Sequence, residues 1–253
     1  MLIYGINPVR EALRAGRVKE LRVADRPAGR IAELVKAAGQ EGIPVRRVAA
    51  GDLDRLARGG VHQSVVADLR EPTNLGIDDL IAGAKGAPLV VVLDGIEDPH
   101  NVGAILRTVD AAGADGVIRQ SRRAAPLGGA AAKASAGAVA HVKIAEVVNI
   151  ARALEELKAV GVWTVGLTGD VQKTYDQVDL TLPTALVLGA EGSGLRRLVR
   201  ERCDSVVSIP LHGHVQSLNV SVAAGIALFE AVRQRSQVSR SPAPPSPGKH
   251  DKI

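Results

Sequence analysis

The 253-residue sequence is poor in aromatic side chains and has a single cysteine. With one Trp, one Phe and two Tyr, an RNA-binding surface built on stacked aromatic rings is not expected. Cys203 alone cannot form an internal disulfide or a cysteine-based zinc site, and its apolar flanks favour a small buried residue over a reactive thiol. His212 and His214 form a pair, but no third ligand is evident, so no metal is expected.

Long apolar runs are also missing. No stretch of about 20 apolar residues is present, so no membrane-spanning helix is expected. The first residues, MLIYGINPVREAL, lack a basic segment followed by an apolar run, so no signal peptide is expected. We therefore predict a cytoplasmic protein that has no membrane partner.

The positive charge is concentrated near the amino terminus. Residues 1–70 carry 13 Lys and Arg against 8 Asp and Glu, whereas the rest of the chain carries 19 of each. A local excess of this kind suits a phosphate-binding surface, because each neutralised phosphate releases counterions. The alternative is a solvated basic face without a partner.

The pattern of short apolar segments predicts a small α/β domain over residues 1–70. We expect an Asn7-capped helix with Pro8 at its first position, and a Gly16 stop. His62-Gln63 is followed by Ser64 and is interpreted as the polar start of a strand. The expected strands are 2–4, 21–24, 43–48 and 61–68, and the expected helices are 7–15, 31–38 and 52–57.

A Pro- and Gly-rich linker over residues 71–88, with one helical piece near 78–84, is predicted to join this domain to a larger one at 89–235. The larger domain opens with the continuous apolar strand Leu89–Asp94, and strands then alternate with helices. This order predicts a parallel sheet covered on both faces. Residues 236–253 hold four prolines and four serines, and we expect them to be disordered.

Three stretches of the larger domain combine a strand end, a polar loop and a helix start: DPHNVGAILRTVDAAGA at 98–114, LVLGAEGSGL at 186–195 and IPLHGHVQSLNVSVAA at 209–224. This arrangement is where α/β proteins bind ligands, although an ordinary strand-to-helix turn is the alternative. In the third stretch, Ser217 or Asn219 can cap the following helix.

In the first stretch, we expect a helix from Val102 to Ala112 with Asn101 as its cap. Gly103 and Arg107 are four residues apart and share a helix face, so a ribose-phosphate could approach Arg107 over the glycine. The alternative for Arg107 is a plain surface arginine. In the second stretch, Glu191 could hold an arginine or an amide in place, or simply face solvent. Its glycine spacing does not match the GxGxxG fingerprint of nicotinamide-binding proteins.

Together and in this order, the three motifs resemble the signature motifs of the SpoU (TrmH) family of S-adenosylmethionine-dependent RNA 2′-O-ribose methyltransferases, within the SPOUT superfamily. The first domain, opening IYGINPVREAL, resembles the substrate-binding domain of the family's bacterial 23S rRNA guanosine enzymes. The resemblance implies a SPOUT-type parallel sheet with a C-terminal trefoil knot, preceded by a small ribosomal-protein-L30-like RNA-binding domain. It also implies a homodimer with the site near the interface. His212, His214 and Gln216 depart from the family's smaller loop residues, and Ser64 stands where the family usually has Gly.

The resemblance also implies individual roles. The arginine at 107 would act on the ribose 2′-hydroxyl. Because a guanidinium has a pKa above ~12, orienting the hydroxyl and stabilising the developing alkoxide is easier than removing its proton. The implied catalytic residues are Arg107, Asn101, Glu191, Ser217 and Asn219. The implied cofactor-binding residues are Leu167, Thr168, Gly169, Leu188, Gly189, Gly192, Ile209, Leu211, Ser217, Leu218 and Asn219. The RNA-binding residues are expected to be Arg10, Arg14, Arg46, Arg47 and His100.

The predicted function is methyl transfer from S-adenosylmethionine to a ribose 2′-oxygen of RNA, with a guanosine of 23S rRNA as the favoured target. Three alternatives stay open. They are a tRNA ribose methyltransferase, a non-catalytic RNA-binding or ribosome-assembly protein on the same fold, and a nucleotide-binding oxidoreductase.

Overall fold

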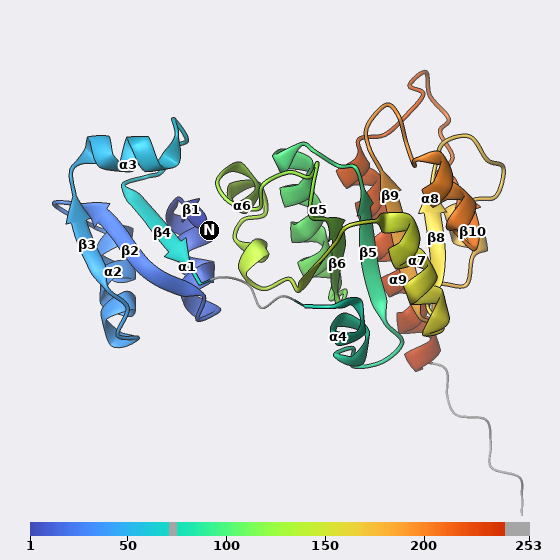
Figure 1. The fold of residues 1–253 in the computed structure, drawn as a ribbon, viewed down its shortest axis with the longest axis horizontal. Coiled ribbons are helices and arrows are strands. Elements are labelled where there is room, and N and C mark those ends of the chain that lie inside the picture. Colours follow the sequence, from blue (N-terminus) through green and yellow to red (C-terminus); the bar gives the residue numbers. More distant parts are fainter. Residues whose placement is uncertain (71–74, 241–253) are drawn as a thin grey trace, which may run out of the picture.

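The computed structural model describes residues 1–70 and 75–240, with side chains up to residue 238, and contains two sheets (Figure 1). One sheet has four strands in the order β1-β4-β2-β3, and the other has six in the order β10-β8-β9-β5-β6-β7. The last helix runs to Arg240, so the prediction of disorder is wrong for residues 236–240. The rest of that predicted tail, residues 241–253, lies outside the described residues.

The first sheet and its helices follow the predicted order along the chain. Strands β2 and β3 are parallel, while β1 and β2 both pair antiparallel with β4. The elements are β1 (Leu2–Tyr4), α1 (Ile6–Arg14), β2 (Val18–Ala24), α2 (Arg30–Gln40), β3 (Val45–Val48), α3 (Ala50–Ala57) and β4 (Val65–Leu69).

Helix α1 shows one error of the sequence prediction. It begins at Ile6, one residue before the predicted cap Asn7. The amide of Ile6 instead donates to Oε1 of Gln63, which lies 57 residues further along the chain, at 3.0 Å. A free first-turn amide needs an acceptor, and here a distant side chain supplies it. His62 also has a structural contact, since its Nδ1 accepts the amide of Ser64 at 3.0 Å.

The larger unit alternates strands and helices as predicted, and all its strand pairings are parallel. Its elements are α4 (Ile77–Ala82), β5 (Leu89–Asp94), α5 (Pro99–Ala112), β6 (Gly116–Gln120), α6 (Ala130–Ala134), η1 (Ala138–Ala140), β7 (Ile144–Val147), α7 (Ile150–Ala159), β8 (Trp163–Leu167), η2 (Tyr175–Gln177), β9 (Thr184–Gly189), α8 (Arg197–Arg202), β10 (Ser205–Val207) and α9 (Val220–Arg240).

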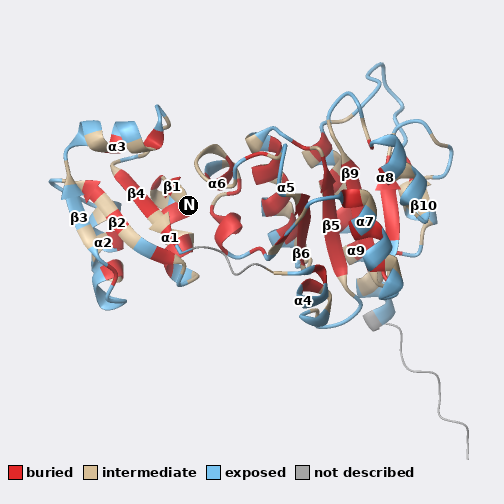
Figure 2. Ribbon diagram, viewed as in Figure 1, coloured by how far each residue is buried: buried red, intermediate tan, exposed pale blue. Residues whose placement is uncertain are grey.

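Strand β5 explains why this sheet is covered on both faces. All six of its residues are buried, and Figure 2 shows buried residues along the neighbouring strands as well. Successive strand side chains point to opposite faces. Val91 and Leu93 therefore join the core formed with α5 and α9, while Val90 and Val92 join a second core with α7 and α8. The predicted parallel sheet with two covered faces is confirmed.

The two units contact each other through the segment that contains α6 and η1 (Figure 1). The amide of Gly129 donates to the carbonyl of Leu2 at 3.2 Å. Nε2 of His141 lies 3.3 Å from Oε2 of Glu11 in α1. Gly137 comes so close to α1 that an added Cβ would lie 2.6 Å from the Cβ of Glu11. The first unit is therefore held against α6 and η1, which in turn pack on α5, the helix that carries the first motif.

Candidate active site

A cavity of about 770 Å³ lies where strands β8, β9 and β10 end. Because these strands are parallel, their carboxyl ends meet at one edge, the usual position of ligand sites in open α/β sheets. The volume falls within the range of about 300–1,000 Å³ that is typical of small-molecule sites. Every residue of the implied cofactor-binding set lines it: Leu167, Thr168, Gly169, Leu188, Gly189, Gly192, Ile209, Leu211, Ser217, Leu218 and Asn219.

Other cavity-lining residues were not identified from the sequence. Asp170 and Arg200 form an ion pair, with 2.6 Å between Oδ2 and Nη1, and Thr168 Oγ1 donates to the other carboxylate oxygen at 2.6 Å. The Thr168 hydrogen bond and then Arg200 lower the pKa of Asp170. No sequence signal joins residues 170 and 200. The remaining additions are neighbours of motif residues: Ala190, Ser193, Gly194, Leu195, Gln216, Val220 and Ala223.

The second motif forms a tight hairpin on the end of β9. Ala190 and Gly194 exchange two backbone hydrogen bonds of 3.1 and 2.9 Å. Gly192 and Gly194 have φ values of 78° and 65°, a region that glycine adopts without steric cost. A Cβ on Gly189 would lie 2.2 Å from the carbonyl carbon of Gly194. The glycines are therefore required by the hairpin itself, and Glu191 is held at its tip.

The side chain of Asn219 joins the three motifs. Its Nδ2 donates to Oδ1 of Asn101 at 2.9 Å and to Oε1 of Glu191 at 2.6 Å. Its Oδ1 accepts the amide of Ser221 at 2.9 Å, which caps the start of α9. Both amide hydrogens and the carbonyl oxygen of Asn219 are thus used, so the orientation of the side chain is fixed.

Asn101 does not cap α5, contrary to the prediction. The helix begins at Pro99, and Asp98 is the cap because its side chain accepts the amide of His100 at 2.9 Å. Asn101 lies within the first turn and is buried, so its side chain is available to Asn219. His100 is exposed beside it.

Arg107 lies apart from the Asn219 network. Its side chain is exposed on α5, outside the set of cavity-lining residues, and it has no hydrogen bond or ion pair within the described part of the chain. The prediction that Gly103 leaves space beside it is wrong. A Cβ on Gly103 would lie 2.5 Å from the carbonyl oxygen of Ala131 and 2.6 Å from the Cβ of Ala134. Gly103 therefore allows α5 and α6 to pack closely.

A buried carboxylate that was not predicted anchors the second motif. Asp94 is the last residue of β5, and its side chain is fully buried. Its oxygens accept the backbone amide of Arg196 at 2.8 Å and Nε of the same arginine at 2.6 Å. Arg196 comes two residues after Gly194, the last residue of the hairpin, so Asp94 anchors the chain on which Glu191 is presented. The available sequence signal was a charged residue that ends an otherwise apolar strand.

The structure does not gather the predicted RNA-binding arginines on one surface. Arg10 and Arg14 lie one turn apart on α1, and Arg14 pairs with Glu11 at 2.9 Å. Arg46 and Arg47 are consecutive in β3, so their side chains point to opposite faces of the sheet. Arg46 also pairs with Glu20 at 2.5 Å.

Cys203 is half-buried, and burial raises the pKa of its thiol to about 12. The thiol is therefore protonated at neutral pH, which agrees with the prediction that it is unreactive. Within residues 1–70 and 75–240, no cluster of three or more His, Cys, Asp or Glu side chains is placed to hold a metal ion. None of the helices in these ranges is long and apolar enough to cross a bilayer.

Two family models match the chain. The SpoU rRNA methylase family model matches residues 88–229, and a model for RNA 2′-O ribose methyltransferase substrate binding matches residues 2–75. The chain is 44% identical over 240 residues to the 23S rRNA (guanosine-2′-O-)-methyltransferase RlmB of Pseudomonas syringae, covering 92% of this chain and 96% of that protein. It is 40% identical to the putative TrmH family tRNA/rRNA methyltransferase YacO of Bacillus subtilis, covering 93% and 96%.

Solved structures are similar as well. The SpoU methyltransferase AviRb from Streptomyces viridochromogenes, in complex with AdoMet, aligns with a TM-score of 0.78 at 28% identity. The alignment covers 94% of this chain and 91% of that chain, so it includes both sheets.

Proposed function

This chain belongs to the SpoU rRNA methylase family, and we propose that it transfers a methyl group from S-adenosylmethionine to a ribose 2′-hydroxyl of RNA, at a guanosine of 23S rRNA. The observation that carries this proposal is the side chain of Asn219, which lines the cavity and joins all three motifs through hydrogen bonds. The 23S rRNA target is supported by the RlmB relative and by the substrate-binding model that matches residues 2–75.

The cavity residues fit S-adenosylmethionine in chemistry and size. Leu188, Ile209 and Leu218 provide apolar walls suited to an adenine ring. Gly189 also lines the cavity, and a side chain there would displace the hairpin that forms this part of the wall. Glu191 brings a negative charge suited to the cationic methionine part. When bound, S-adenosylmethionine would supply an electrophilic methyl group on a sulfonium, whose sulfur becomes a neutral sulfide once the methyl group is transferred.

The chain's own residues have two tasks in this reaction. Asn101, Glu191 and Asn219 form a fixed polar junction that orients the ribose beside the cavity, because positioning the two reacting atoms at ~3 Å supplies much of the rate. Arg107 lies outside the cavity of its own chain, so its permanent positive charge would stabilise the developing negative charge on the 2′-oxygen where a second copy of the chain completes the site. Because the leaving sulfide is neutral, no acid is required, and the proton of the 2′-hydroxyl is released to solvent as the new O–C bond forms.

We further propose that two copies of the chain form a homodimer through α9. Val222 and Phe229 on this helix are 49% and 50% exposed, and Phe229 is the only phenylalanine in the sequence. Gly225 lies on the same helix face, and a Cβ there would be 3.8 Å from Cγ2 of Thr108, the neighbour of Arg107 in α5. A second copy on this face would bring the isolated Arg107 close to an interface.

Light scattering tests the dimer. Phe229→Asp should give a monomer, while the same charge placed at Val148, which is 83% exposed, should leave the dimer intact. A monomeric wild-type chain would refute the proposal.

The division of labour between the units is also proposed. Residues 1–70 would bind the RNA substrate, residues 71–88 would connect the units, and residues 89–235 would hold the cofactor within a trefoil knot of the SPOUT type. The basic excess of residues 1–70 supports their assignment to RNA. We expect the enzyme to act in the cytoplasm, where ribosomal RNA is made and assembled.

The test is methyl transfer from labelled S-adenosylmethionine to unmodified 23S rRNA and, in parallel, to unmodified tRNA. Label at one alkali-resistant linkage of 23S rRNA is expected, because a methylated 2′-oxygen blocks alkaline cleavage. Label only in tRNA would show that the substrate is tRNA and that the reaction is still methyl transfer to RNA. Absence of cofactor binding by calorimetry would favour the non-catalytic RNA-binding alternative, and protection against unfolding by NAD(H) would favour the oxidoreductase.

A further inference from the structure

Arg119 is a buried cation that is only partly paired. Arg119 lies in β6 and is 6% exposed. Its Nη1 is buried and has no hydrogen-bond partner in the part of the chain that the structure describes. The neighbouring carboxylate is Glu146 of strand β7, with Oε1 3.5 Å from Nε and a side chain that is 45% exposed. Burial lowers the pKa of Arg119, and Glu146 opposes this effect. Buried donors are normally satisfied, so an unmet guanidinium nitrogen indicates a missing acceptor.

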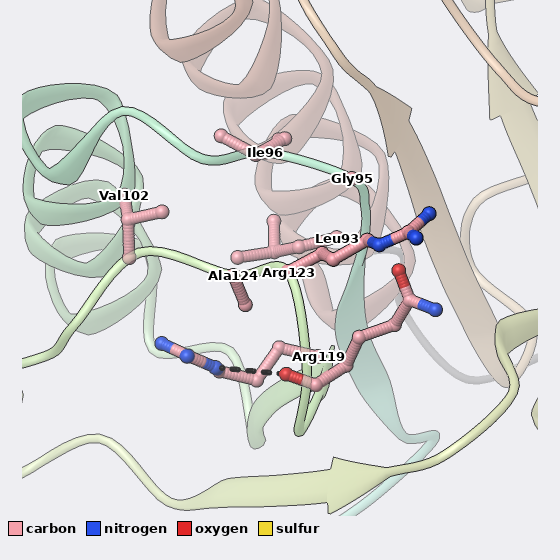
Figure 3. Close-up of a pocket in the computed structure, with 8 residues that line it drawn as sticks. Leu93, Gly95, Ile96, Val102, Arg119, Arg123 and Ala124 are labelled. Atoms are coloured by element: carbon pink, nitrogen blue, oxygen red, sulfur yellow. Dashed lines mark hydrogen bonds between the residues drawn. The ribbon is translucent and has the colours of Figure 1, made fainter.

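A small pocket adjoins this guanidinium. Its volume is about 10 Å³, enough for one oxygen-sized atom. The apolar side chains of Leu93, Ile96 and Val102 form much of its wall, and Arg119 and Arg123 supply its charge. Figure 3 shows Arg119 extending toward helix α5 and the Arg123 guanidinium on another side of the pocket. Arg123 is exposed and has no ion-pair partner within residues 1–70 and 75–240, so it is free to turn toward a ligand.

The strand order places this pocket beside the candidate active site. Strands β8, β9, β5 and β6 are neighbours and parallel, so their carboxyl ends follow one another along one edge of the sheet. The cofactor cavity lies at the ends of β8 and β9, and the pocket lies at the ends of β5 and β6. Asn101, in the helix after β5, is followed directly by the pocket residue Val102. The pocket therefore adjoins the helix turn that would position the ribose in the proposed reaction.

We propose that Arg119 and Arg123 form a phosphate site for the RNA backbone next to the methylated ribose. One non-bridging oxygen enters the pocket and accepts from Nη1 of Arg119, and Arg123 binds the same phosphate from outside. Guanidinium groups suit this task because their donors match the geometry of phosphate oxygens. The proposal rests on the proposed RNA methylation and adds a specific backbone contact to it. A single trapped water is the competing occupant.

The test compares Arg119→Gln, Arg123→Gln and Arg152→Gln in the 253-residue chain. Arg152 is an exposed arginine of α7, across the sheet, so its variant controls for the loss of one positive charge. The affinity for unmodified 23S rRNA transcript is measured as a function of salt. Each lost phosphate contact should reduce the slope of log K against log salt by about 0.7–0.9. We expect this reduction in the Arg119 and Arg123 variants but not in the control.

The outcomes separate the possible occupants. Wild-type slopes in both site variants would overturn the proposal, and a lower melting temperature of Arg119→Gln with no change in slope would identify a structural water. Inorganic phosphate that stabilises the wild type but not Arg119→Gln, again with unchanged RNA slopes, would identify a free anion and overturn the RNA assignment. If Arg119→Gln does not fold, the salt slope of the Arg123→Gln variant tests the proposal, because Arg123 is exposed and its replacement should not affect folding. If the wild type methylates RNA but both variants have the same salt slope as the wild type, only the phosphate site is refuted. If the wild type does not bind S-adenosylmethionine, the proposed function is refuted.

Discussion

The ion pair of Asp94 and Arg196 is expected to contribute strongly to stability. The Asp94 side chain is fully buried, whereas that of Arg196 is 52% exposed. Replacing Arg196 by Met leaves a buried carboxylate without its counter-charge, a change that typically costs about 3–5 kcal/mol. Asp94 keeps the backbone amide of residue 196 at 2.8 Å, so we expect the lower end, about 3 kcal/mol. For a chain of this size, that corresponds to a melting temperature lower by roughly 6–12 °C.

Arg197 offers a matched control one residue away. It pairs with Glu201 across one helical turn at 2.9 Å, and both side chains are exposed. Such a pair contributes about 0.3–0.5 kcal/mol, so Arg197→Met should unfold nearly as the wild type does. Urea unfolding followed by circular dichroism measures both variants. The reasoning is refuted if the two variants unfold within about 1 kcal/mol of each other, since the pair would then contribute no more than a surface contact.

Three further predictions concern backbone geometry and pH. Gly189→Ala should weaken S-adenosylmethionine binding at least tenfold by calorimetry, because the new Cβ would lie 2.2 Å from Gly194, whereas Gly213→Ala has nothing within 4 Å and should bind normally. Ser64→Gly should raise the free energy of unfolding by about 0.5–1 kcal/mol, because Ser64 has a φ of 62° that glycine adopts more easily; equal or lower stability would contradict this. Burial alone would raise the pKa of Asp204, but hydrogen bonds from Lys158 and Thr164 lower it overall. A carboxyl group whose pKa is lower in the folded state than in the unfolded state stabilises the protein at pH values above its unfolded-state pKa. This stabilisation is lost as the pH falls through the folded-state pKa. Asp204→Asn should therefore be less stable at pH 7 and match the wild type in strong acid; a difference independent of pH would argue against this charge effect.

Local patterns predicted most of the larger unit. Strand β5 has the predicted bounds, Leu89–Asp94, because a continuous apolar run between turn residues is a signal contained within six positions. The alternation of strands and helices likewise specified a parallel sheet. Since parallel strands end at one edge, the polar loops of the second and third motifs had to gather there, and the implied cofactor residues line a single cavity.

Helix caps were harder to assign, because several polar residues close together can each accept an amide. The sequence Asp98-Pro99-His100-Asn101 offers two candidates, and the structure selects Asp98 with Pro99 at the first helical position. For α1, the acceptor is Gln63, which no local rule connects with Ile6.

What the sequence determined by itself is the order of elements, the parallel sheet and the three motif loops, since each depends on residues that are neighbours in the chain. Tertiary structure alone decided which side chains meet. Asn219 reaches Asn101 across 118 positions, and Asp94 reaches Arg196 across 102. The tertiary structure also fills the space beside Gly103 with α6, and it buries Arg119 with no hydrogen-bond acceptor for Nη1 in the described residues. Hydrogen bonds and close packing are short-ranged in space, so they depend on how distant segments fold together and not on sequence spacing.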